Sequence, residues 1–160
     1  MDAWQPLHDL AVGDHVGIPR RVPVFGRVYE PLARVRLLAY FIAEGGLTHG
    51  VPCFTTADPL LRGDFEFCLE DEFPTVQMAP HPDGITYRIS RKPEHRTPAR
   101  PGELANPVAR WLDEMGLFGL KSEAKFIPPV VWTWDERCLA TFLNVLFTCD
   151  GTIYEMNGYP

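Results

Sequence analysis

The sequence predicts a mixed α/β fold of the α+β class in one compact domain. Two long apolar segments, residues 31–44 and 136–150, each close on an acidic residue followed by glycine, and they have the length of buried helices. Short segments between them are bounded by glycine, proline and aspartate, which predicts strands and turns. The chain has 160 residues, of which 46% are hydrophobic. That is enough for one core and too little for two ordinary domains.

The first half of the chain predicts strands followed by a buried helix. Residues 7–19 alternate around a Gly13-Asp14 turn and run into Arg-Arg-Val-Pro-Val-Phe at 20–25, a pattern typical of strand, turn and strand. Residues 31–44 form a nearly continuous apolar run ended by Gly45-Gly46, which predicts a helix buried on most sides. A strand is the alternative for this run, because its periodicity does not separate the two structures.

The middle of the chain predicts a strand, a helix and a hairpin. A strand at 51–56 precedes Asp58-Pro59, a helix N-cap followed by a proline at the first helical position, and the helix is expected to reach about residue 72. Strands at 75–78 and 85–89 are joined through Pro82-Asp83-Gly84, whose residue types favour a turn. Residues 92–102 are polar and rich in proline, which predicts a loop.

Two more helices are expected in the last third of the chain. Asn106-Pro107 begins a helix with apolar residues at 108, 111, 112 and 115, all on one face, before Gly116. We interpret this face as core packing. Asp135 is the N-cap of the last helix, which ends at Asp150-Gly151.

Charge and cysteine content restrict the classes of function. The net charge is −6, which does not favour non-specific DNA binding by the whole molecule. Residues 20–36 and 84–100 nevertheless each hold five basic residues against one glutamate, a net charge of +4, so a basic face and a solvated mixture of charges both remain open. The four cysteines lack zinc-ligand spacing. No signal peptide or membrane-length apolar run occurs, and we expect a cytoplasmic protein with reduced thiols.

An internal repeat is the feature that points to chemistry. Residues 37–45 and 143–151 are both apolar helical segments that close on an acid and a glycine, Glu44-Gly45 and Asp150-Gly151. Small residues four apart, Ala39 with Ala43 and Val145 with Cys149, allow the two helices to pack closely. A carboxylate at a helix C-terminus, next to a second carboxylate, is unfavourable unless a cation is bound. Hard oxygen ligands suit Mg²⁺, which assists phosphodiester cleavage.

These segments resemble the LAGLIDADG, or dodecapeptide, motif of homing endonucleases. Residues 121–128, Lys-Ser-Glu-Ala-Lys-Phe-Ile-Pro, resemble the short basic block between the two motifs of intein-borne members, and residues 7–19 resemble a splicing-domain strand. The whole is most similar to inteins in replicative DNA helicases. The resemblance implies a splicing-domain-like lead-in at 1–30 and an endonuclease domain at 31–160, with one αββαββα-like repeat plus a second motif helix.

The resemblance also implies an activity, site-specific cleavage of double-stranded DNA with Mg²⁺ as cofactor. Glu44 and Asp150 would be the catalytic, metal-binding acids, and the motif glycines Gly45 and Gly151 would belong to the metal site. Lys125 would be the basic residue near the cleavage centre that assists catalysis. The strands would lie in the major groove and read base edges. DNA contacts are expected from four basic residues: Arg88, Arg91, Lys92 and Lys121.

Two departures from the family pattern lead to further expectations. Only nine residues follow Gly151, so we expect an incomplete second repeat and weak or lost cutting, which a homodimer could rescue by supplying a second sheet. Met1 and the final Asn157-Gly-Tyr-Pro160 lack the splicing residues, so no protein splicing is expected. The alternatives to an endonuclease are a DNA-binding module that does not cut and an inert intein remnant.

Overall fold

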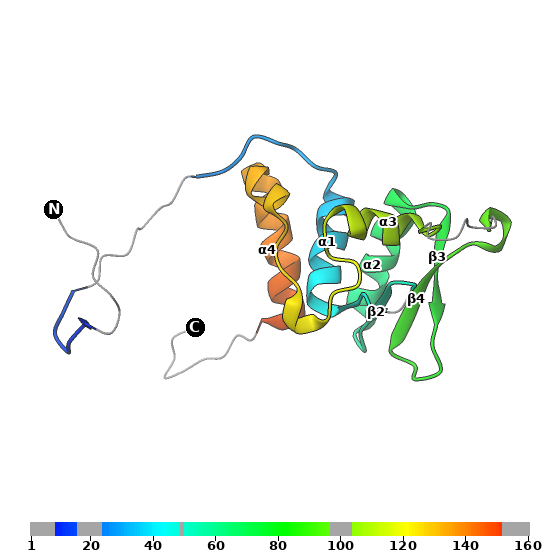
Figure 1. Cartoon of the computed structure of the whole chain (residues 1–160), viewed down its shortest axis with the longest axis horizontal. Helices are drawn as coiled ribbons and strands as arrows, with labels where there is room; N and C mark the ends of the chain where they lie inside the picture. Colours follow the sequence, from blue (N-terminus) through cyan, green and yellow to red (C-terminus); the bar gives the residue numbers. More distant parts are fainter. Residues whose placement is uncertain (1–8, 16–23, 49, 97–103, 152–160) are drawn as a thin grey trace.

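The computed structural model describes residues 9–15, 24–48, 50–96 and 104–151. Helices α1, α2 and α4 stand side by side, with α1 in the middle, and the sheet lies beyond α2 (Figure 1). The elements follow in this order: α1 (Leu32–Glu44), β1 (Gly45–Gly46), β2 (Cys53–Thr55), α2 (Pro59–Glu72), β3 (Val76–Pro80), β4 (Thr86–Arg91), α3 (Pro107–Glu114) and α4 (Glu136–Asp150). This mixture of helices and one antiparallel sheet confirms the predicted α+β class.

Helix starts follow the predicted caps. Asp58 Oδ1 accepts the N–H of Leu60 at 2.7 Å, Asn106 Oδ1 accepts that of Val108 at 2.9 Å, and Asp135 Oδ1 accepts that of Cys138 at 2.8 Å. Each carboxylate or amide oxygen thereby satisfies an N–H group that has no partner within the helix. The strand alternative for residues 31–44 is wrong, because 13 of these residues form α1.

The sheet has the strand order β1-β2-β4-β3, and all neighbours are antiparallel. The predicted turn joins β3 to β4: Asp83 Oδ1 accepts the N–H groups of Ile85 and Thr86 at 3.1 and 2.9 Å, and these bonds lower the pKa of Asp83 to about 2. Strand β1 was not predicted. Its two glycines were interpreted only as the end of the preceding helix, and pairing with Phe54 and Cys53 makes them an edge strand.

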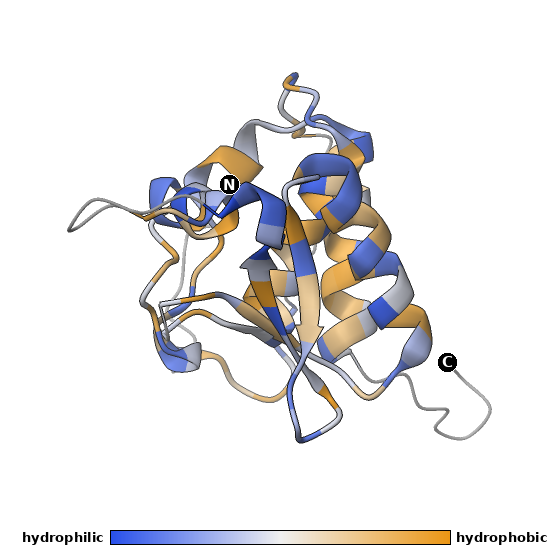
Figure 2. Cartoon of the chain, turned by 90° about the vertical axis from the view of Figure 1, so that its right-hand side faces the viewer, coloured by the Kyte–Doolittle hydropathy of each residue, from blue (hydrophilic) through white to orange (hydrophobic). Residues whose placement is uncertain are grey.

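Alternation along the strands gives the sheet two different faces. Phe54, Val76 and Ile89 are fully buried and point toward the helices. Figure 2, viewed from the sheet side, shows hydrophilic and hydrophobic residues along the same strands. Directly paired residues share a face, so the outer face carries mostly small or polar side chains: Cys53, Thr55, Gln77, Ala79, Thr86, Arg88 and Ser90.

The core joins this sheet to the helices through aromatic rings. Phe54 of β2 stacks on Phe65 of α2 with ring centroids 4.2 Å apart, and Phe41 of α1 meets Phe65 edge to face at 5.3 Å. Trp111 of α3 contacts Phe41 in the same way, which confirms the core-packing interpretation of that helix. Within the described residues, no helix has the length and apolarity required to span a membrane.

The loop predicted at 92–102 contains a 3-10 turn at Pro93–His95, and its residues 97–102 lie outside the described part of the chain. A further 3-10 turn, Pro129–Thr133, precedes α4. Near the N-terminus, residues 9–15 contain the predicted turn, in which Ala11 O accepts the N–H of Asp14 at 3.1 Å, and no strand. Of the remaining residues predicted as strand, 7–8 and 16–23 lie outside the described residues, and 24–25 form no strand.

Candidate functional site

Helices α1 and α4 pack along each other and bring their C-terminal ends to the same side of the molecule (Figure 1). Ala39 and Val145 are buried in this contact region, and Ala43 and Cys149 are half-buried. These are the small residues, four apart on each helix, that predicted close packing of the two helices. The packing therefore places Glu44, the last residue of α1, near Asp150, the last residue of α4.

The two helices end in the same way. Gly45 follows α1 with φ −77° and ψ 134°, and Gly151 follows α4 with φ −80° and ψ 146°. A Cβ at Gly45 would collide with the carbonyl oxygen of Phe41, and a Cβ at Gly151 would collide with that of Phe147. The requirement for glycine is therefore close approach to the preceding helical turn, and the internal repeat in the sequence corresponds to a repeated helix end.

Glu44 and Asp150 interact electrostatically. Burial is the main cause that raises the pKa of the half-buried Glu44 carboxyl, and the negative charge of Asp150 raises it further. The positive charge of Lys125 lowers the pKa of Glu44. Asp150 itself is exposed at the end of α4. The pair thus joins one sheltered carboxyl and one solvent-facing carboxyl, the arrangement in which a bound cation would relieve repulsion.

Lys125 reaches the end of α1 from a segment 80 residues away. Its Nζ donates hydrogen bonds to Gly45 O at 2.7 Å and to Ile42 O at 3.0 Å. Ile42 O is in the last turn of α1 and Gly45 O belongs to the residue that caps the helix, and a cation is favourable at this end of the helix dipole. Burial lowers the pKa of Lys125, while Glu44, Asp150 and Cys53 raise it. Three sequence-predicted residues, Glu44, Asp150 and Lys125, therefore form one electrostatic cluster.

Cys53 and Cys149 also border this cluster, which the sequence analysis did not recognise. Cys53 Sγ lies 3.6 Å from Gly46 O, and a Cβ at Gly46 would collide with that sulfur. Cys149 precedes Asp150, and burial together with Glu44 and Asp150 raises the pKa of its thiol to about 11. A thiol with a raised pKa is a weaker nucleophile than an ordinary cysteine at neutral pH. Cysteines 53 and 149 have no sequence spacing that relates them, because strand pairing and helix packing bring them to the site.

The oxygen atoms at the helix ends fit Mg²⁺ in chemistry. This ion is commonly held by one or two carboxylates, with water and phosphate oxygens as its other ligands. Across the described residues, no group of three or more His, Cys, Asp and Glu side chains is placed to hold a metal, so Glu44 and Asp150 would act as a sparse pair. The backbone oxygen of Gly45 already accepts from Lys125. The metal roles of Gly45 and Gly151 stay predictions.

The basic residues predicted to contact DNA lie at two places. Arg88 is exposed on the outer face of the sheet and pairs across the strands with Cys53, whereas Arg91 and Lys92 are half-buried at the end of β4. Lys121 is exposed just before the 3-10 turn Ser122–Ala124, which Lys125 follows. The structure therefore brings Arg88 near the cluster through Cys53 and keeps Lys121 on the segment that supplies Lys125.

A hollow lies beside Arg88 on the outer face. It has a volume of about 340 Å³ and is lined by Val51, Cys53, His81, Thr86 and Arg88. On the same face, the hydroxyl groups of Thr55 and Thr86 are hydrogen-bonded at 3.2 Å. Because Cys53 borders both the hollow and the Lys125 cluster, the polar face of the sheet is continuous with the carboxylate pair.

Comparison with known proteins finds similarity to one region of much longer chains. The chain is 32% identical over 164 residues to replicative DNA helicase DnaB of Nostoc sp., covering 97% of this chain and 18% of that protein. DnaB of Rhodothermus marinus is 29% identical over 166 residues, and DnaB of Synechocystis sp. is 24% identical over 159 residues, each with 17% of its length covered. The chain thus spans less than a fifth of these curated relatives, a share consistent with an insertion such as an intein. No protein family model matches it.

Proposed function

We propose that this chain is part of a LAGLIDADG homing endonuclease of the intein-borne kind. It would hydrolyse phosphodiester bonds of double-stranded DNA, with Mg²⁺ held by Glu44 and Asp150. The observation that carries this proposal is the cluster at the paired ends of α1 and α4, where two carboxyl groups and the Lys125 ammonium influence one another. Similarity to one region of replicative helicases supports the view that the chain corresponds to a segment inserted into such a protein.

Phosphodiester hydrolysis requires a proton to leave the attacking water and another to reach the leaving oxygen. Bound Mg²⁺ would supply Lewis-acid stabilisation of negative charge on oxygen and would lower the pKa of a water. Glu44 and Asp150 supply the carboxylate oxygens that hold and orient it. Their opposite exposure suits this role, because Asp150 is open to solvent and to a DNA phosphate while Glu44 is sheltered.

Lys125 is placed to handle a proton or to stabilise phosphate charge. As an ammonium it has three N–H donors, and the carbonyls of Gly45 and Ile42 accept two of them. The third remains for a phosphate oxygen or a water. As a neutral amine it would keep the two carbonyl bonds and present a lone pair at the same position. The burial that lowers the pKa of Lys125 makes the neutral form more accessible than in a solvated lysine.

The outer face of the sheet is the surface that we assign to DNA. Its polar side chains and Arg88 can form hydrogen bonds with base edges in the major groove, which is wide enough for a two-stranded ribbon. Because this face adjoins Cys53 and Lys125, DNA bound on it would have a phosphodiester close to the carboxylate pair. The exposed acidic residues of α2, Glu66, Glu70 and Asp71, lie on a helix and not on the outer face of the sheet, so this part of the negative charge is not on the proposed DNA surface.

The direct test is cleavage of a plasmid that carries the uninterrupted helicase coding sequence. We expect nicking or cutting with Mg²⁺ and none with EDTA. Glu44→Gln and Asp150→Asn each remove a metal-binding charge and should lower the rate by on the order of 100-fold or more. Glu70→Gln, at an exposed position of α2, is the matched control and should cut like the unmodified chain.

Two outcomes would redirect the proposal. Salt-dependent DNA binding that survives Glu44→Gln, without any cutting, would support a DNA-binding module, the second candidate, which the polar outer face also favours. Cutting that is unchanged in both carboxylate variants would reject Glu44 and Asp150 as the metal site.

A further inference from the structure

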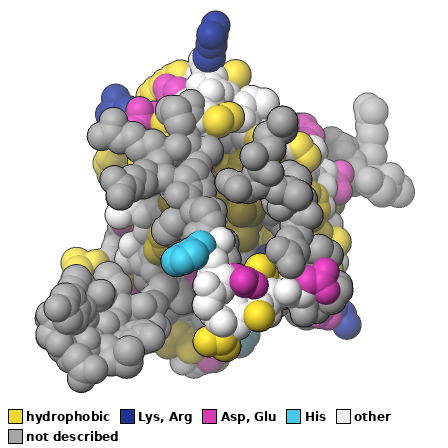
Figure 3. All heavy atoms as spheres, turned by 90° about the vertical axis from the view of Figure 1, so that its left-hand side faces the viewer, with side chains coloured by type: hydrophobic (Ala, Val, Ile, Leu, Met, Phe, Trp, Pro, Cys, Tyr) yellow, Lys and Arg dark blue, Asp and Glu magenta, His cyan; other side chains and the backbone are white. Residues whose placement is uncertain are grey.

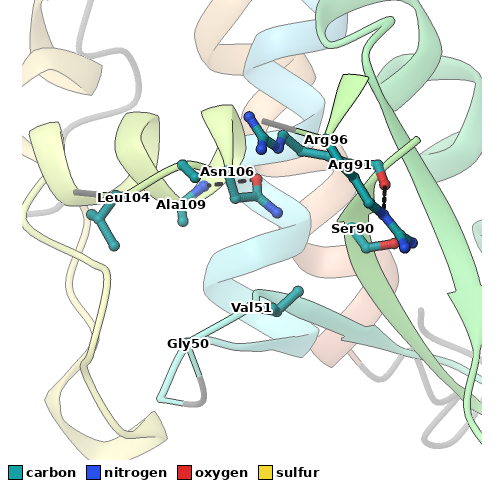
Figure 4. Close-up of a pocket in the computed structure, with 9 residues that line it drawn as sticks. Gly50, Val51, Ser90, Arg91, Arg96, Leu104, Asn106 and Ala109 are labelled. Carbon is teal, nitrogen blue, oxygen red and sulfur yellow. Dashed lines mark hydrogen bonds between the residues drawn. The ribbon is translucent and has the colours of Figure 1, made fainter. Parts of the chain in front are cut away.

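The hollow beside Arg88 on the outer sheet face has a half-buried floor and an exposed rim. Its volume is about 340 Å³. Val51, Cys53 and Thr86 are half-buried and form the floor, whereas Arg88 and His81 are exposed and form the rim. Val51 also lines the neighbouring hollow of Figure 4, so it lies where the two hollows meet.

The floor offers an apolar surface, because its polar groups have partners within the protein. Cys53 Sγ donates to Gly46 O at 3.6 Å, and the hydroxyl groups of Thr86 and Thr55 are hydrogen-bonded at 3.2 Å. Val51 contributes only methyl groups. A polar atom placed on this floor would lose water without gaining a new partner, whereas a methyl group would lose nothing. The floor therefore suits a methyl group.

Arg88 lies between two small side chains. Its neighbours across the sheet are Cys53 on β2 and Ala79 on β3, and all three lie on the outer face. None of the ion pairs between described residues uses Arg88. A guanidinium group is planar and can donate to two acceptors at once, as guanine O6 and N7 require.

His81 extends the outer face by one residue beyond β3. Its backbone N–H donates to Thr86 O at 2.8 Å, which places His81 opposite Thr86. Its Nδ1 lies 3.2 Å from Asp83 Oδ2. Hydrogen bonds from Thr86 and Ile85 lower the pKa of Asp83 to about 2, so this carboxylate accepts a hydrogen bond from Nδ1. In a neutral imidazole ring, a proton on Nδ1 leaves Nε2 as an acceptor.

The strand order β2-β4-β3 arranges these groups in one row across the sheet. Val51 and Cys53 lie on the β2 side, Arg88 lies on β4, and His81 follows β3. The row thus offers an apolar surface, then donors, then an acceptor. In the major groove, a thymine followed by a guanine presents the complementary row: the thymine methyl group, guanine N7 and O6, and the N4 amino group of the paired cytosine.

We propose that this hollow reads a 5′-TG-3′ step of the DNA target. The thymine methyl group would contact Val51 and Cys53, and guanine O6 and N7 would accept hydrogen bonds from Arg88. The N4 amino group of the cytosine paired with that guanine would donate to His81. The inference rests on the proposed function and narrows it, since it names two successive base pairs that the outer face selects.

Base analogues test this site in the unmodified chain. Binding of a random duplex library in EDTA, at about pH 8 where histidine is neutral, followed by sequencing, gives the preferred site. Each thymine of that site is then replaced by deoxyuridine, which removes only the methyl group, and affinity is measured by fluorescence anisotropy. One thymine that precedes a guanine should lose about fourfold in affinity, the effect of one buried methyl group. Replacing that guanine by 7-deazaguanine should cost on the order of tenfold.

Variants assign each contact to its residue. In Val51→Ala the deoxyuridine effect should disappear, and Arg88→Gln should change the preference from guanine to adenine, whose N6 and N7 suit a glutamine side chain. His81→Ala should reduce discrimination against an A·T pair at the guanine position, because thymine O4 there replaces the cytosine amino donor. Val24→Ala and Arg137→Gln, exposed outside the sheet, are the matched controls. Circular dichroism melting of every variant ensures that lost selectivity is not lost folding.

The outcomes separate this inference from the proposed nuclease. A preferred site at which no thymine before a guanine responds to deoxyuridine would overturn the inference, and so would a response that persists in folded Val51→Ala. If such a chain still cuts DNA, the nuclease stands and the hollow alone loses its role. A confirmed 5′-TG-3′ contact in a chain that does not cut would leave the hollow standing and reject the nuclease. A chain that binds no duplex would overturn this inference together with the assignment of the outer face to DNA.

Discussion

Glu44 is the residue whose protonation is most informative about the site. Its pKa is raised by burial first and by Asp150 second, so the folded protein binds the carboxyl proton more tightly than the unfolded chain does. The ionised carboxylate therefore destabilises the folded state. This penalty is absent below the ordinary pKa of 4.5, grows as the pH rises toward the raised pKa, and is fully present above it.

We expect Glu44→Gln to raise the melting temperature near pH 7 by a few degrees in the absence of divalent ions, because it removes this penalty. Below about pH 4 the gain should vanish, since Glu44 is then largely protonated in both states. Added Mg²⁺ should stabilise the unmodified chain and leave Glu44→Gln unchanged.

Thermal melting followed by circular dichroism at several pH values measures these effects. Glu70→Gln, exposed on α2, should show neither the gain nor a changed response to Mg²⁺. Equal melting temperatures for Glu44→Gln and the unmodified chain at pH 7 would contradict the electrostatic description of the site.

Lys125 illustrates how a residue can serve structure and chemistry together. Its two hydrogen bonds to Gly45 O and Ile42 O hold the end of α1, whichever function the cluster has. A role in stability alone would explain those bonds. Glu44 and Asp150 both raise the pKa of Lys125, and the proposed catalysis would use this electrostatic coupling.

Among the elements, α1 and α4 are distinguished by their matching ends. Both helices close with glycine in an extended conformation, and in both the glycine approaches the carbonyl four residues earlier. Each acid is followed directly by a glycine with extended backbone angles, so Glu44 and Asp150 each occupy the last position of a helix.

Alanine substitutions at glycines separate this close approach from helix propensity. Gly45→Ala and Gly151→Ala should each destabilise the fold by about 1–3 kcal/mol, because the added Cβ forces the backbone to shift. Gly63→Ala, inside α2 where a Cβ meets open space, should instead stabilise by about 0.5–1 kcal/mol.

Urea unfolding of the three variants measures these differences. If alanine at 45 and 151 were tolerated as well as alanine at 63, close approach would not be the reason for the motif glycines.

Across the whole molecule, aromatic side chains in the core connect the sheet to the helix pair α1 and α4. Phe65 stacks on Phe54 of the sheet and meets Phe41 of α1 edge to face, so one side chain links the proposed DNA face to the helix that carries Glu44. Loss of that side chain should affect the entire fold, since a domain of this size has a stability of only about 5–15 kcal/mol.

Phe65→Ala should destabilise the protein by about 3–5 kcal/mol through the cavity it creates. Phe67→Ala is a matched control on the same helix, because Phe67 is 67% exposed, and its effect should stay within about 0.5 kcal/mol. Equilibrium unfolding in urea compares the two variants. A small effect of Phe65→Ala would mean that the sheet and α1 are not coupled through this ring.

The outer side of α4 is the other large-scale feature. Leu143 is 42% exposed and Phe147 is 64% exposed on this helix. Figure 3, viewed from the left-hand side of Figure 1, shows hydrophobic, acidic and basic side chains interspersed among the described residues that are visible. Sedimentation of the purified chain would test the homodimer considered from the sequence.

Local sequence was sufficient to place the helices and the hairpin. Each helix N-cap accepts a hydrogen bond from a backbone N–H two or three residues further along the chain, at Asp58, Asn106 and Asp135. Asp83 does the same in the turn between β3 and β4. Such short-range hydrogen bonds can be predicted from the local sequence alone. The acid-glycine repeat also identified both helix ends. Strand β1 was not predicted because two glycines have no strand propensity, and they form a strand only by pairing with β2.

Packing determined what those local elements do together. Lys125 contacts Gly45, which is 80 residues away in the sequence, and Arg88 pairs with Cys53 across the sheet. Arg96 donates a hydrogen bond back to Arg91. No periodicity in the sequence predicts these contacts. Helix ends and turns are set by interactions between near neighbours in sequence. The cluster of Glu44, Asp150 and Lys125 exists because a shared core holds α1, α4 and the segment before α4 in one arrangement.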